Sequence, residues 1–389
     1  MSWEVKKLSD CCASIADGDH QAPPKSDSGV PFVTISNINT SNQFDFTDTM
    51  FVRQEYYDRL DSKRKAQKGD VLYSVVGTFG IPVYMKETVP FVFQRHIAIL
   101  RPNDTMLPQF LYYTMLSRDF YMMADAAALG AAQRTISLTA LRNMKISVPP
   151  MDVQEKIVGV LSAYDTLIEN NQKQIKLLEE AAQRLYKEWF VDLRFPGHET
   201  TPIVDGVPVG WRRERLVDLV DVQYGYAFDG SLFNTAKNGM PIIRIRNIPS
   251  GNTDDYTTEE ADSQYIVHNG DILVGMDGEF HINSWSGPDA YLVQRTCSFR
   301  PNNSEMKGYL LQAIYEPIKY FENTVVGATV AHLGKKHIDT INVLTCPTNL
   351  YVPLQDYYEQ RQLLLNQNWL LAEARDRLLP KLMSGEIEV

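Results

Sequence analysis

The chain contains one series of short motifs twice, in the same order and at a spacing of about 200 residues. Such a repeat constrains the fold before any single element is assigned, because both copies must be able to form the same domain. Alternating apolar residues and Gly-Asp turns within the motifs are typical of short β-strands. We therefore expect two copies of one mixed α/β domain, each followed by a helical segment. The matched blocks, first copy before second, are WEVKKLSD (3–10) and WRRERLVD (211–218), GVPFVTISNI (29–38) and GMPIIRIRNI (239–248), KGDVLYSVVGTFG (68–80) and NGDILVGMDGEFH (269–281), Gln94-Arg95 and Gln294-Arg295, and the Arg-Pro-Asn runs at 101–103 and 300–302.

A heptad pattern follows each copy, with apolar residues at alternating spacings of four and three, as in a coiled-coil seam. The polar Asn171 in the first seam is the type of residue that fixes register at some cost in stability. The second seam is weaker, since it contains Asn368 and Arg375, and Pro380 is expected to kink or end that helix. The alternative is a long helix packed on a globular core. The expected interface residues are Ile157, Leu161, Tyr164, Ile168, Asn171, Ile175, Leu178, Leu185 and Trp189 in the first helix, and Leu364, Leu371, Leu378 and Leu382 in the second.

The expected fold class is α+β: two similar mixed α/β domains joined by two long helices that form an intramolecular antiparallel coiled coil. The segment RFPGHETTPIVDGVPVG between the halves carries three prolines and three glycines and is interpreted as a linker. The expected boundaries are a first α/β domain at 1–150, a helix at 151–193, the linker at 194–210, a second α/β domain at 211–350 and a second helix at 351–389.

A net charge of -10 argues, on its face, against a DNA-binding protein. The charges are segregated, however: residues 251–262 hold five acids and no base, whereas residues 129–145 hold three bases and no acid. Local basic faces remain compatible with this pattern, and so does an ordinary solvated surface. No zinc-ligand spacing involves the four cysteines, and neither a membrane span nor a signal peptide is visible. We expect reduced thiols and a cytoplasmic location.

The motifs of common active sites are missing from the sequence. There is no Gly-rich phosphate loop, no H-E-x-x-H, and no Asn/Asp-Pro-Pro-Tyr/Phe signature of amino-methyltransferases. Asp277, Glu279 and His281 resemble an acid/base or metal cluster, but Val76, Thr78 and Gly80 occupy the matching positions of the first copy. These observations favour recognition over catalysis.

Two segments resemble conserved regions of the specificity subunits of type I restriction-modification systems. They are VPPMDVQEKIVGVLSAYDTLIENNQKQIKLLEEAAQRLYKEWF (148–190) and RDRLLPKLMSGEIEV (375–389). The shorter motifs DGDHQAPP, GTFG, GAAQRTIS, YGYAF and GATVAHL are typical of the target-recognition domains of that family. CPTNLYVPLQDYYEQ (346–360) departs from the Pro-Pro-x-x-x-Gln form present at 149–154, which leaves the start of the second helix open.

The resemblance implies a non-catalytic subunit in which two target-recognition domains each read one half of a bipartite, asymmetric double-stranded DNA target. The paired helices would hold these domains apart and dock two methylation subunits. Restriction/translocase subunits would complete the complex in the prokaryotic cytoplasm. S-adenosylmethionine, ATP and Mg²⁺ are expected on those partners, with no cofactor in this chain, and no membrane is involved.

The repeat suggests which side chains contact DNA. Positions identical in both copies, such as Gln94-Arg95 and Gln294-Arg295, cannot distinguish two different half-sites and are expected to hold structure or contact phosphate. Divergent polar residues on matching loops are candidates for base contact, because Gln pairs with adenine, Arg with guanine, and Glu with the cytosine amine. The candidates are Thr78, Gln133 and Arg134 in the first domain and Glu279, His281, Thr329 and His332 in the second.

Three other functions remain open on sequence grounds. The chain could be a reader in a methylation-only or other defence complex. It could be a coiled-coil interaction protein without a DNA role, which predicts no salt-dependent DNA binding. A self-sufficient methyltransferase or nuclease is opposed by the missing motifs.

Overall fold

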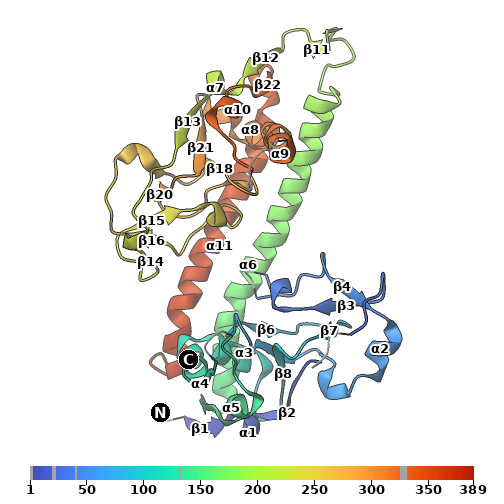
Figure 1. Ribbon diagram of the computed structural model, residues 1–389, viewed down its shortest axis with the longest axis vertical. Helices are drawn as coiled ribbons and strands as arrows, with labels where there is room; N and C mark the ends of the chain where they lie inside the picture. The colour runs from blue at the N-terminus through green and yellow to red at the C-terminus, as the bar shows by residue number, and fades with distance from the viewer. Residues whose placement is uncertain (1–2, 20–22, 40–41, 131–132, 325–330) are drawn as a thin grey trace. The chain divides into compact units, whose positions relative to one another are not determined.

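The computed structural model describes residues 3–19, 23–39, 42–130, 133–324 and 331–389 (Figure 1). It divides into two compact units. Unit 1 contains Met1–Asp165 together with Glu373–Val389, and unit 2 contains Thr166–Ala372. The sequence-based boundaries lie at the ends of the two long helices, whereas this division passes through both helices. Each unit therefore includes a part of each long helix.

Unit 1 contains two small sheets and a separate pair of antiparallel strands formed by its first and last strands. The larger sheet is antiparallel with the order β2-β8-β5-β6, and the smaller has the order β4-β3-β7, in which β3 and β7 are parallel. The strands are β1 Glu4–Lys7, β2 Cys12–Asp17, β3 Val30–Val33, β4 Met50–Val52, β5 Val71–Ser74, β6 Pro82–Tyr84, β7 Val92–Phe93, β8 Ile97–Pro102 and β9 Lys145–Val148, with β1 paired to β9. The helices are α1 Leu8–Cys11, α2 Gln54–Arg59, α3 Pro108–Leu116, α4 Arg118–Ala127 and α5 Leu138–Asn143, with 3-10 turns at Ile35–Asn37 and Ser62–Arg64.

Unit 2 repeats this plan. Its antiparallel sheet has the order β13-β21-β18-β19, a second sheet has the order β14-β16-β15-β20-β17, and β12 pairs with β22. The strands are β12 Arg212–Arg215, β13 Val220–Tyr224, β14 Phe233–Asn234, β15 Met240–Ile243, β16 Tyr256–Thr257, β17 Ile266–Val267, β18 Ile272–Gly275, β19 Ile282–Ser284, β20 Ala290–Leu292, β21 Thr296–Pro301 and β22 Asn342–Thr345. The helices are α7 Leu216–Leu219, α8 Lys307–Ala313, α9 Tyr315–Thr324 and α10 Lys335–Ile338, with 3-10 turns at Gly230–Leu232, Ile245–Asn247, Ser263–Tyr265, Ser304–Met306 and Thr348–Leu350.

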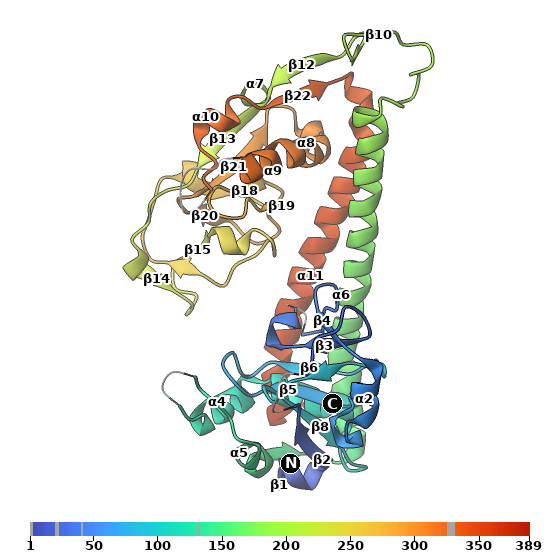
Figure 2. The ribbon, with the colours of Figure 1, turned by 45° about the vertical axis from the view of Figure 1, so that its right-hand side comes forward.

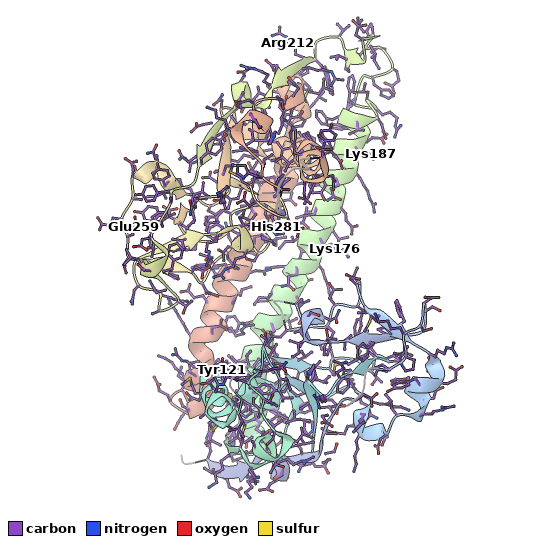
Figure 3. All side chains as sticks on the ribbon, in the orientation of Figure 1. Tyr121, Lys176, Lys187, Arg212, Glu259 and His281 are labelled. Atoms are coloured by element: carbon purple, nitrogen blue, oxygen red, sulfur yellow. The ribbon has the colours of Figure 1, made fainter. Side chains whose placement is uncertain are left out.

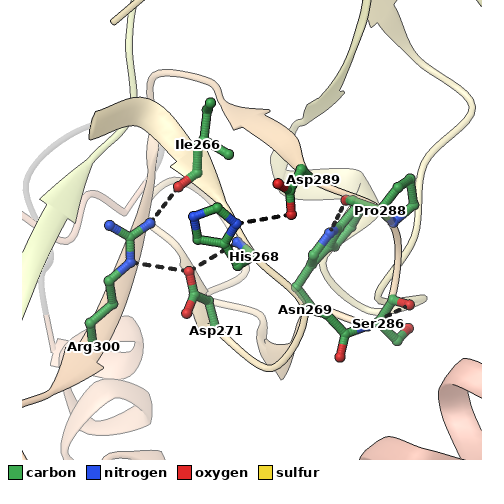
Figure 4. Close-up of polar contacts among 9 residues, drawn as sticks. Ile266, His268, Asn269, Asp271, Ser286, Pro288, Asp289 and Arg300 are labelled. Carbon is green, nitrogen blue, oxygen red and sulfur yellow. Dashed lines mark hydrogen bonds and ion pairs between the residues drawn. The ribbon is translucent and has the colours of Figure 1, made fainter. Parts of the chain in front are cut away.

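The Gly-Asp and Arg-Pro-Asn motifs recur because they bond to each other. Arg101 donates to Asp70 at 2.8 Å, and Arg300 donates to Asp271 at 3.0 Å and to the carbonyl of Ile266 (Figure 4). Each pair ties the start of one central strand to the end of its neighbour. Buried ion pairs of this kind need such matched geometry, since an unpaired buried charge is costly.

One part of the repeat alignment is wrong by one residue: Gln94-Arg95 does not correspond to Gln294-Arg295. The N–H of Val75 donates to the carbonyl of His96, and the equivalent bond in unit 2 runs from Met276 to the carbonyl of Arg295, both at 2.8 Å. Arg295 therefore corresponds to His96, and Arg95 to Gln294. Backbone hydrogen bonds determine which residues of the two units are equivalent here. The two Gln-Arg pairs are identical in sequence but do not occupy equivalent positions. Arg295 is consequently a divergent position rather than a shared one.

The expected linker, 194–210, contains ordered structure. Ile203–Val204 (β10) and Val207–Pro208 (β11) form a hairpin around Asp205 and Gly206, whose φ angles are 51° and 74°. Positive φ at both turn residues is typical of the two-residue turns that Asp-Gly favours. Phe195 packs in the core of unit 2.

The two long helices are α6 Met151–Tyr186, which continues into a π-helical turn at Lys187–Val191, and α11 Val352–Ser384 (Figure 2). They are antiparallel. In unit 1 Asp165 pairs with Arg375 at 2.7 Å, and in unit 2 Glu179 pairs with Arg361 at 2.7 Å, so the partner's number falls as the number along α6 rises. The expected α+β class, with two similar domains and two long antiparallel helices, is confirmed.

The predicted seam residues lie in three environments. Ile157, Leu161, Leu378 and Leu382 pack in the core of unit 1, while Leu185 and Trp189 pack in that of unit 2. Asn171 is buried and its amide donates to Gln367 at 3.4 Å. The remaining members, which are half-buried except for the buried Ile175, are Tyr164, Ile168, Ile175, Leu178, Leu364 and Leu371. The ends of each helix are thus also parts of a globular core.

Pro380 was expected to kink or end the second helix. It does not end the helix, because α11 continues to Ser384. Proline removes its own N–H and its ring crowds the carbonyl four residues earlier, but Leu379 and Leu382 on either side are buried in the core of unit 1. Their packing offsets the lost bond.

The start of the second helix also repeats that of the first. In unit 1 the Gln154 Oε1 accepts from the N–H of Leu107 at 2.9 Å, and in unit 2 the Gln355 Oε1 accepts from the N–H of Gly308 at 3.0 Å. Gln355 therefore takes the role of Gln154, although the double proline is absent.

We expect Gln154→Ala to lower the free energy of unfolding by about 1–3 kcal/mol, because it leaves buried and partly buried backbone groups without this partner. The Gln154 amide also donates to the carbonyls of Thr105 and Pro149. Urea denaturation followed by circular dichroism measures the change. Gln183→Ala is the matched control, since Gln183 is exposed on the same helix. Equal stability of the two variants would contradict the anchoring role of Gln154.

Candidate nucleic-acid interface

Three segments meet at one surface of unit 1. They are residues 76–80, the turn at 94–96 and the loop at 133–137, named here the unit 1 loop site. The N–H of Gly77 donates to the carbonyl of Arg134 at 3.0 Å, and that of Ile136 donates to the carbonyl of Val75 at 2.9 Å. Ser137 then caps α5 by accepting from the N–H of Ala140 at 3.1 Å. The loops are therefore held by backbone bonds, which leaves their side chains free to vary.

Unit 2 has the same arrangement, formed by residues 277–281, 293–295 and 331–334 and named here the unit 2 loop site. The N–H of Gly278 donates to the carbonyl of Ala331 at 3.0 Å, and that of Leu333 donates to the carbonyl of Met276 at 2.8 Å. An antiparallel bridge joins Asp277 to His332, as Val76 joins Thr135 in unit 1. The two backbones match while the side chains differ.

An aromatic stack supports the unit 1 loop site. Tyr121, labelled on α4 in Figure 3, stacks on Phe79 with ring centroids 5.8 Å apart at 14°. The guanidinium carbon of Arg134 lies over the ring of Phe79, 5.4 Å from its centroid. Arg134 also forms an ion pair with Asp125. Cation–π contact and the ion pair together restrict the orientation of this arginine.

Charged side chains converge in the unit 2 loop site. The Asp277 carboxylate contacts His332 Nδ1 at 2.5 Å and Arg295 Nε at 3.4 Å. Glu279 is exposed and lies 3.5 Å from His281 Nδ1. An electronegative group between two cations or donors fixes both of them, so Asp277 organises this site.

The comparisons with known proteins agree across the chain. The model of the type I restriction modification DNA specificity domain matches residues 1–180 and 208–349. The MjaIX specificity subunit of Methanocaldococcus jannaschii is 24% identical, over 100% of this chain and 94% of that protein. The HindI specificity subunit of Haemophilus influenzae is 21% identical, over 92% of this chain and 95% of that protein. A crystal structure of a type I S subunit from M. genitalium has the same fold, with a TM-score of 0.55 and 15% identity over 98% of this chain and 96% of that one. The chain belongs to the family of type I restriction-modification specificity subunits.

The structure places most of the predicted DNA-contacting residues of this specificity subunit in the two loop sites. Thr78, Gln133 and Arg134 are exposed in the unit 1 loop site. Glu279, Arg295 and His332 are exposed in the unit 2 loop site, and His281 is half-buried there. Gln94 is half-buried and Arg95 exposed at the turn of unit 1, whereas Thr329 lies outside the described residues. DNA contact by each of them remains a prediction.

Sequence reasoning did not predict which side chains support the predicted readers. Phe79, Tyr121 and Asp125 hold Arg134, and Asp277 holds Arg295 and His332. A signal was available for α4, because Phe120 and Ala124 share its buried face and therefore direct Tyr121 outward.

A neutral histidine lies beside the unit 2 loop site. Burial lowers the pKa of His337, and the nearby charges of Lys336 and His332 lower it further. Its Nδ1 accepts from the N–H of Gly334 at 3.0 Å, which requires an unprotonated Nδ1. The ring stacks on Phe321 at 5.2 Å, so His337 packs as an aromatic side chain.

Within the described ranges, no group of three or more His, Cys, Asp or Glu side chains could hold a metal ion. Over the same residues, every helix is too short or too polar to cross a bilayer.

We expect Phe79→Ala to destabilise the protein by about 3–5 kcal/mol, since it removes a largely buried ring. Asp125→Ala should cost less than about 1 kcal/mol, because its pair with Arg134 is partly exposed. Urea denaturation of both variants measures the difference. A loss in Asp125→Ala as large as that in Phe79→Ala would contradict this ranking and show that the ion pair stabilises the loop as much as the ring does.

Proposed function

We propose that this specificity subunit reads a bipartite, asymmetric double-stranded DNA target, one half with each loop site. The observation that carries the proposal is the combination of matching backbones and different side chains. Val76, His96 and Thr135 occupy in unit 1 the positions of Asp277, Arg295 and His332 in unit 2. Two readers with one framework and different donors and acceptors would recognise different base sequences.

The helices provide the second part of the proposal. Pairs such as Asp165–Arg375 and Glu179–Arg361 fix the register of α6 and α11 inside each unit. A helical scaffold would keep the spacing between the two half-sites constant, and its exposed surfaces would dock two methylation subunits. Exposed apolar residues on these helices, which such partners could cover, are Val160, Leu167, Leu177, Val352, Leu363 and Leu370.

Catalysis would reside on the partners. We propose that the methylation subunits bind S-adenosylmethionine and methylate adenine, and that restriction/translocase subunits use ATP and Mg²⁺. This chain would contribute recognition alone, in the prokaryotic cytoplasm where its DNA target lies. The difference between the two loop sites supports this role, because a catalytic group at Asp277 would have no counterpart at Val76.

Coexpression of this chain with the methylation subunit encoded beside it, in a host without DNA methylation, is expected to produce one bipartite motif with a fixed spacer. Long-read sequencing maps N6-methyladenine across the genome. The methylation subunit expressed without this chain is the control, and should give no motif. A continuous motif, or unchanged methylation without this chain, would contradict the two-reader model. A stable complex that neither methylates nor binds DNA in a salt-dependent manner would favour a scaffold protein.

Within that assay, Arg134→Ala or Gln133→Ala should relax one half of the motif by about 1–3 kcal/mol of discrimination and leave the other half unchanged. The physical reason is the loss of a side chain that reads one base edge. Arg215→Ala is the matched control, because Arg215 forms an exposed ion pair with Asp218 outside both loop sites and outside the two long helices. Equal relaxation of both halves would refute independent reading by the two units.

A further inference from the structure

Arg295 has a backbone conformation that residues with a side chain rarely adopt. Its φ is 70°, and the equivalent His96 of unit 1 is not among the described residues with positive φ. Backbone bonds hold this turn: the Met276 N–H donates to the Arg295 carbonyl at 2.8 Å, and the Gln294 N–H donates to the carbonyl of Tyr226 at 2.7 Å. Unit 1 has the equivalent bonds without a positive φ at His96, so these bonds alone do not require it. Glycine would fit here without strain. Unfavourable backbone conformations persist where the surrounding structure holds them, and they cluster at functional sites.

The side chain of Arg295 is directed by Asp277. One carboxylate oxygen of Asp277 lies 3.4 Å from Arg295 Nε, and the other lies 2.5 Å from His332 Nδ1. The exposed fractions of the side chains are 28% for Asp277, 56% for Arg295 and 47% for His332. The carboxylate is therefore the most covered member, with the two side chains it holds facing solvent.

The hydrogen-bonding roles in this cluster follow from the distances. Arg295 Nη1 also lies 3.4 Å from His332 Nδ1, but a nitrogen that donates to Asp277 cannot accept from an arginine. The shorter contact, at 2.5 Å, assigns the Nδ1 proton to the bond with Asp277. Asp277 thus engages the Nε side of Arg295, and the terminal amines remain as a planar pair of donors.

We propose that Arg295 reads a guanine in the half-site recognised by unit 2, and that Asp277 is the positioning residue that orients its guanidinium. The inference rests on the proposed function above. A planar pair of donors matches the O6 and N7 acceptors of guanine in the major groove. Val76 and His96 occupy the equivalent positions in unit 1, so this mode of reading belongs to unit 2 alone.

Removal of the Asp277 charge distinguishes a residue that positions Arg295 from one that only changes the general attraction of the loop to DNA. A carboxylate at a DNA-facing loop repels phosphate, so its removal should strengthen binding to every sequence. If Asp277 orients Arg295, the same removal should weaken discrimination at one base. Asp277→Asn is therefore expected to bind duplexes without the motif more tightly and to discriminate less, and a purely structural residue would not produce this opposed pair of effects.

The test uses the full chain coexpressed with its methylation subunit, with Arg295→Gly, Arg295→Lys and Asp277→Asn. Glycine adopts a φ of 70° freely, so Arg295→Gly should keep or raise the Tm while it removes the reader. Lysine keeps the charge but lacks the planar pair of donors. Arg215→Ala is the matched control, since Arg215 forms an exposed ion pair with Asp218 elsewhere in unit 2. The readouts are the methylation motif, methylation rates on duplexes with the guanine replaced, affinity for a duplex without the motif, and Tm.

We expect Arg295→Gly and Arg295→Lys to lose about 5- to 150-fold discrimination at one guanine of one half-site, with all other positions unchanged. Asp277→Asn should relax the same position less, and Arg215→Ala should retain the wild-type motif. An unchanged motif in Arg295→Gly, or an equal loss at every position, would overturn the guanine-reading role. An unchanged motif in Asp277→Asn would overturn the positioning role. A wild-type complex without a bipartite motif would instead overturn the proposed function, and this inference with it.

Discussion

Each unit completes its core with residues from both long helices, and this constraint determines the rest of the architecture. In unit 1, Leu161 of α6 and Leu382 of α11 share one apolar cluster, although they are far apart in sequence. In unit 2, Ala182 of α6 and Leu354 of α11 do the same. Neither domain can bury its core without both helices, so folding of the domains and antiparallel pairing of the helices are coupled. Such non-local contacts cost chain entropy, which the large buried apolar surfaces offset.

The shared framework of the units is maintained by a small set of polar contacts at equivalent positions. Arg101–Asp70 and Arg300–Asp271 join the central strands, and Gln154 and Gln355 anchor the starts of the long helices. Because these contacts hold the backbone, the loop sites can change side chains without changing the fold. Rigid support combined with variable loops is the usual means by which one fold acquires different specificities.

The sequence predicted the repeat, the α+β class and the long antiparallel helices, since each depends on periodic or repeated patterns. It failed where tertiary contacts outweigh local preference. Pro380 lies within α11 because neighbouring leucines are buried, and the Gln294-Arg295 pair misled the alignment because backbone bonds fix the register. The contacts that support the predicted DNA-reading residues, such as that of Asp277 with His332, could not be predicted from the sequence for a similar reason. The two residues are about 55 positions apart, and no local pattern encodes their contact.

The acidic composition is compatible with DNA recognition because many of the acids are engaged within the fold. In the acidic stretch 251–262, Asp255 pairs with Arg246, Glu259 accepts from the N–H of Asp229, and Asp262 caps a 3-10 turn. Arg246 screens the charge of Asp255 locally and backbone dipoles stabilise the other two, while the formal net charge of -10 stays the same. Attraction to phosphate depends on the charges near the contact surface, within about 10 Å at moderate salt. The net charge of the whole chain is therefore a poor indicator of DNA recognition by a few loops. The positions of Arg295, Arg134 and their acidic partners in the loop sites are a better indicator.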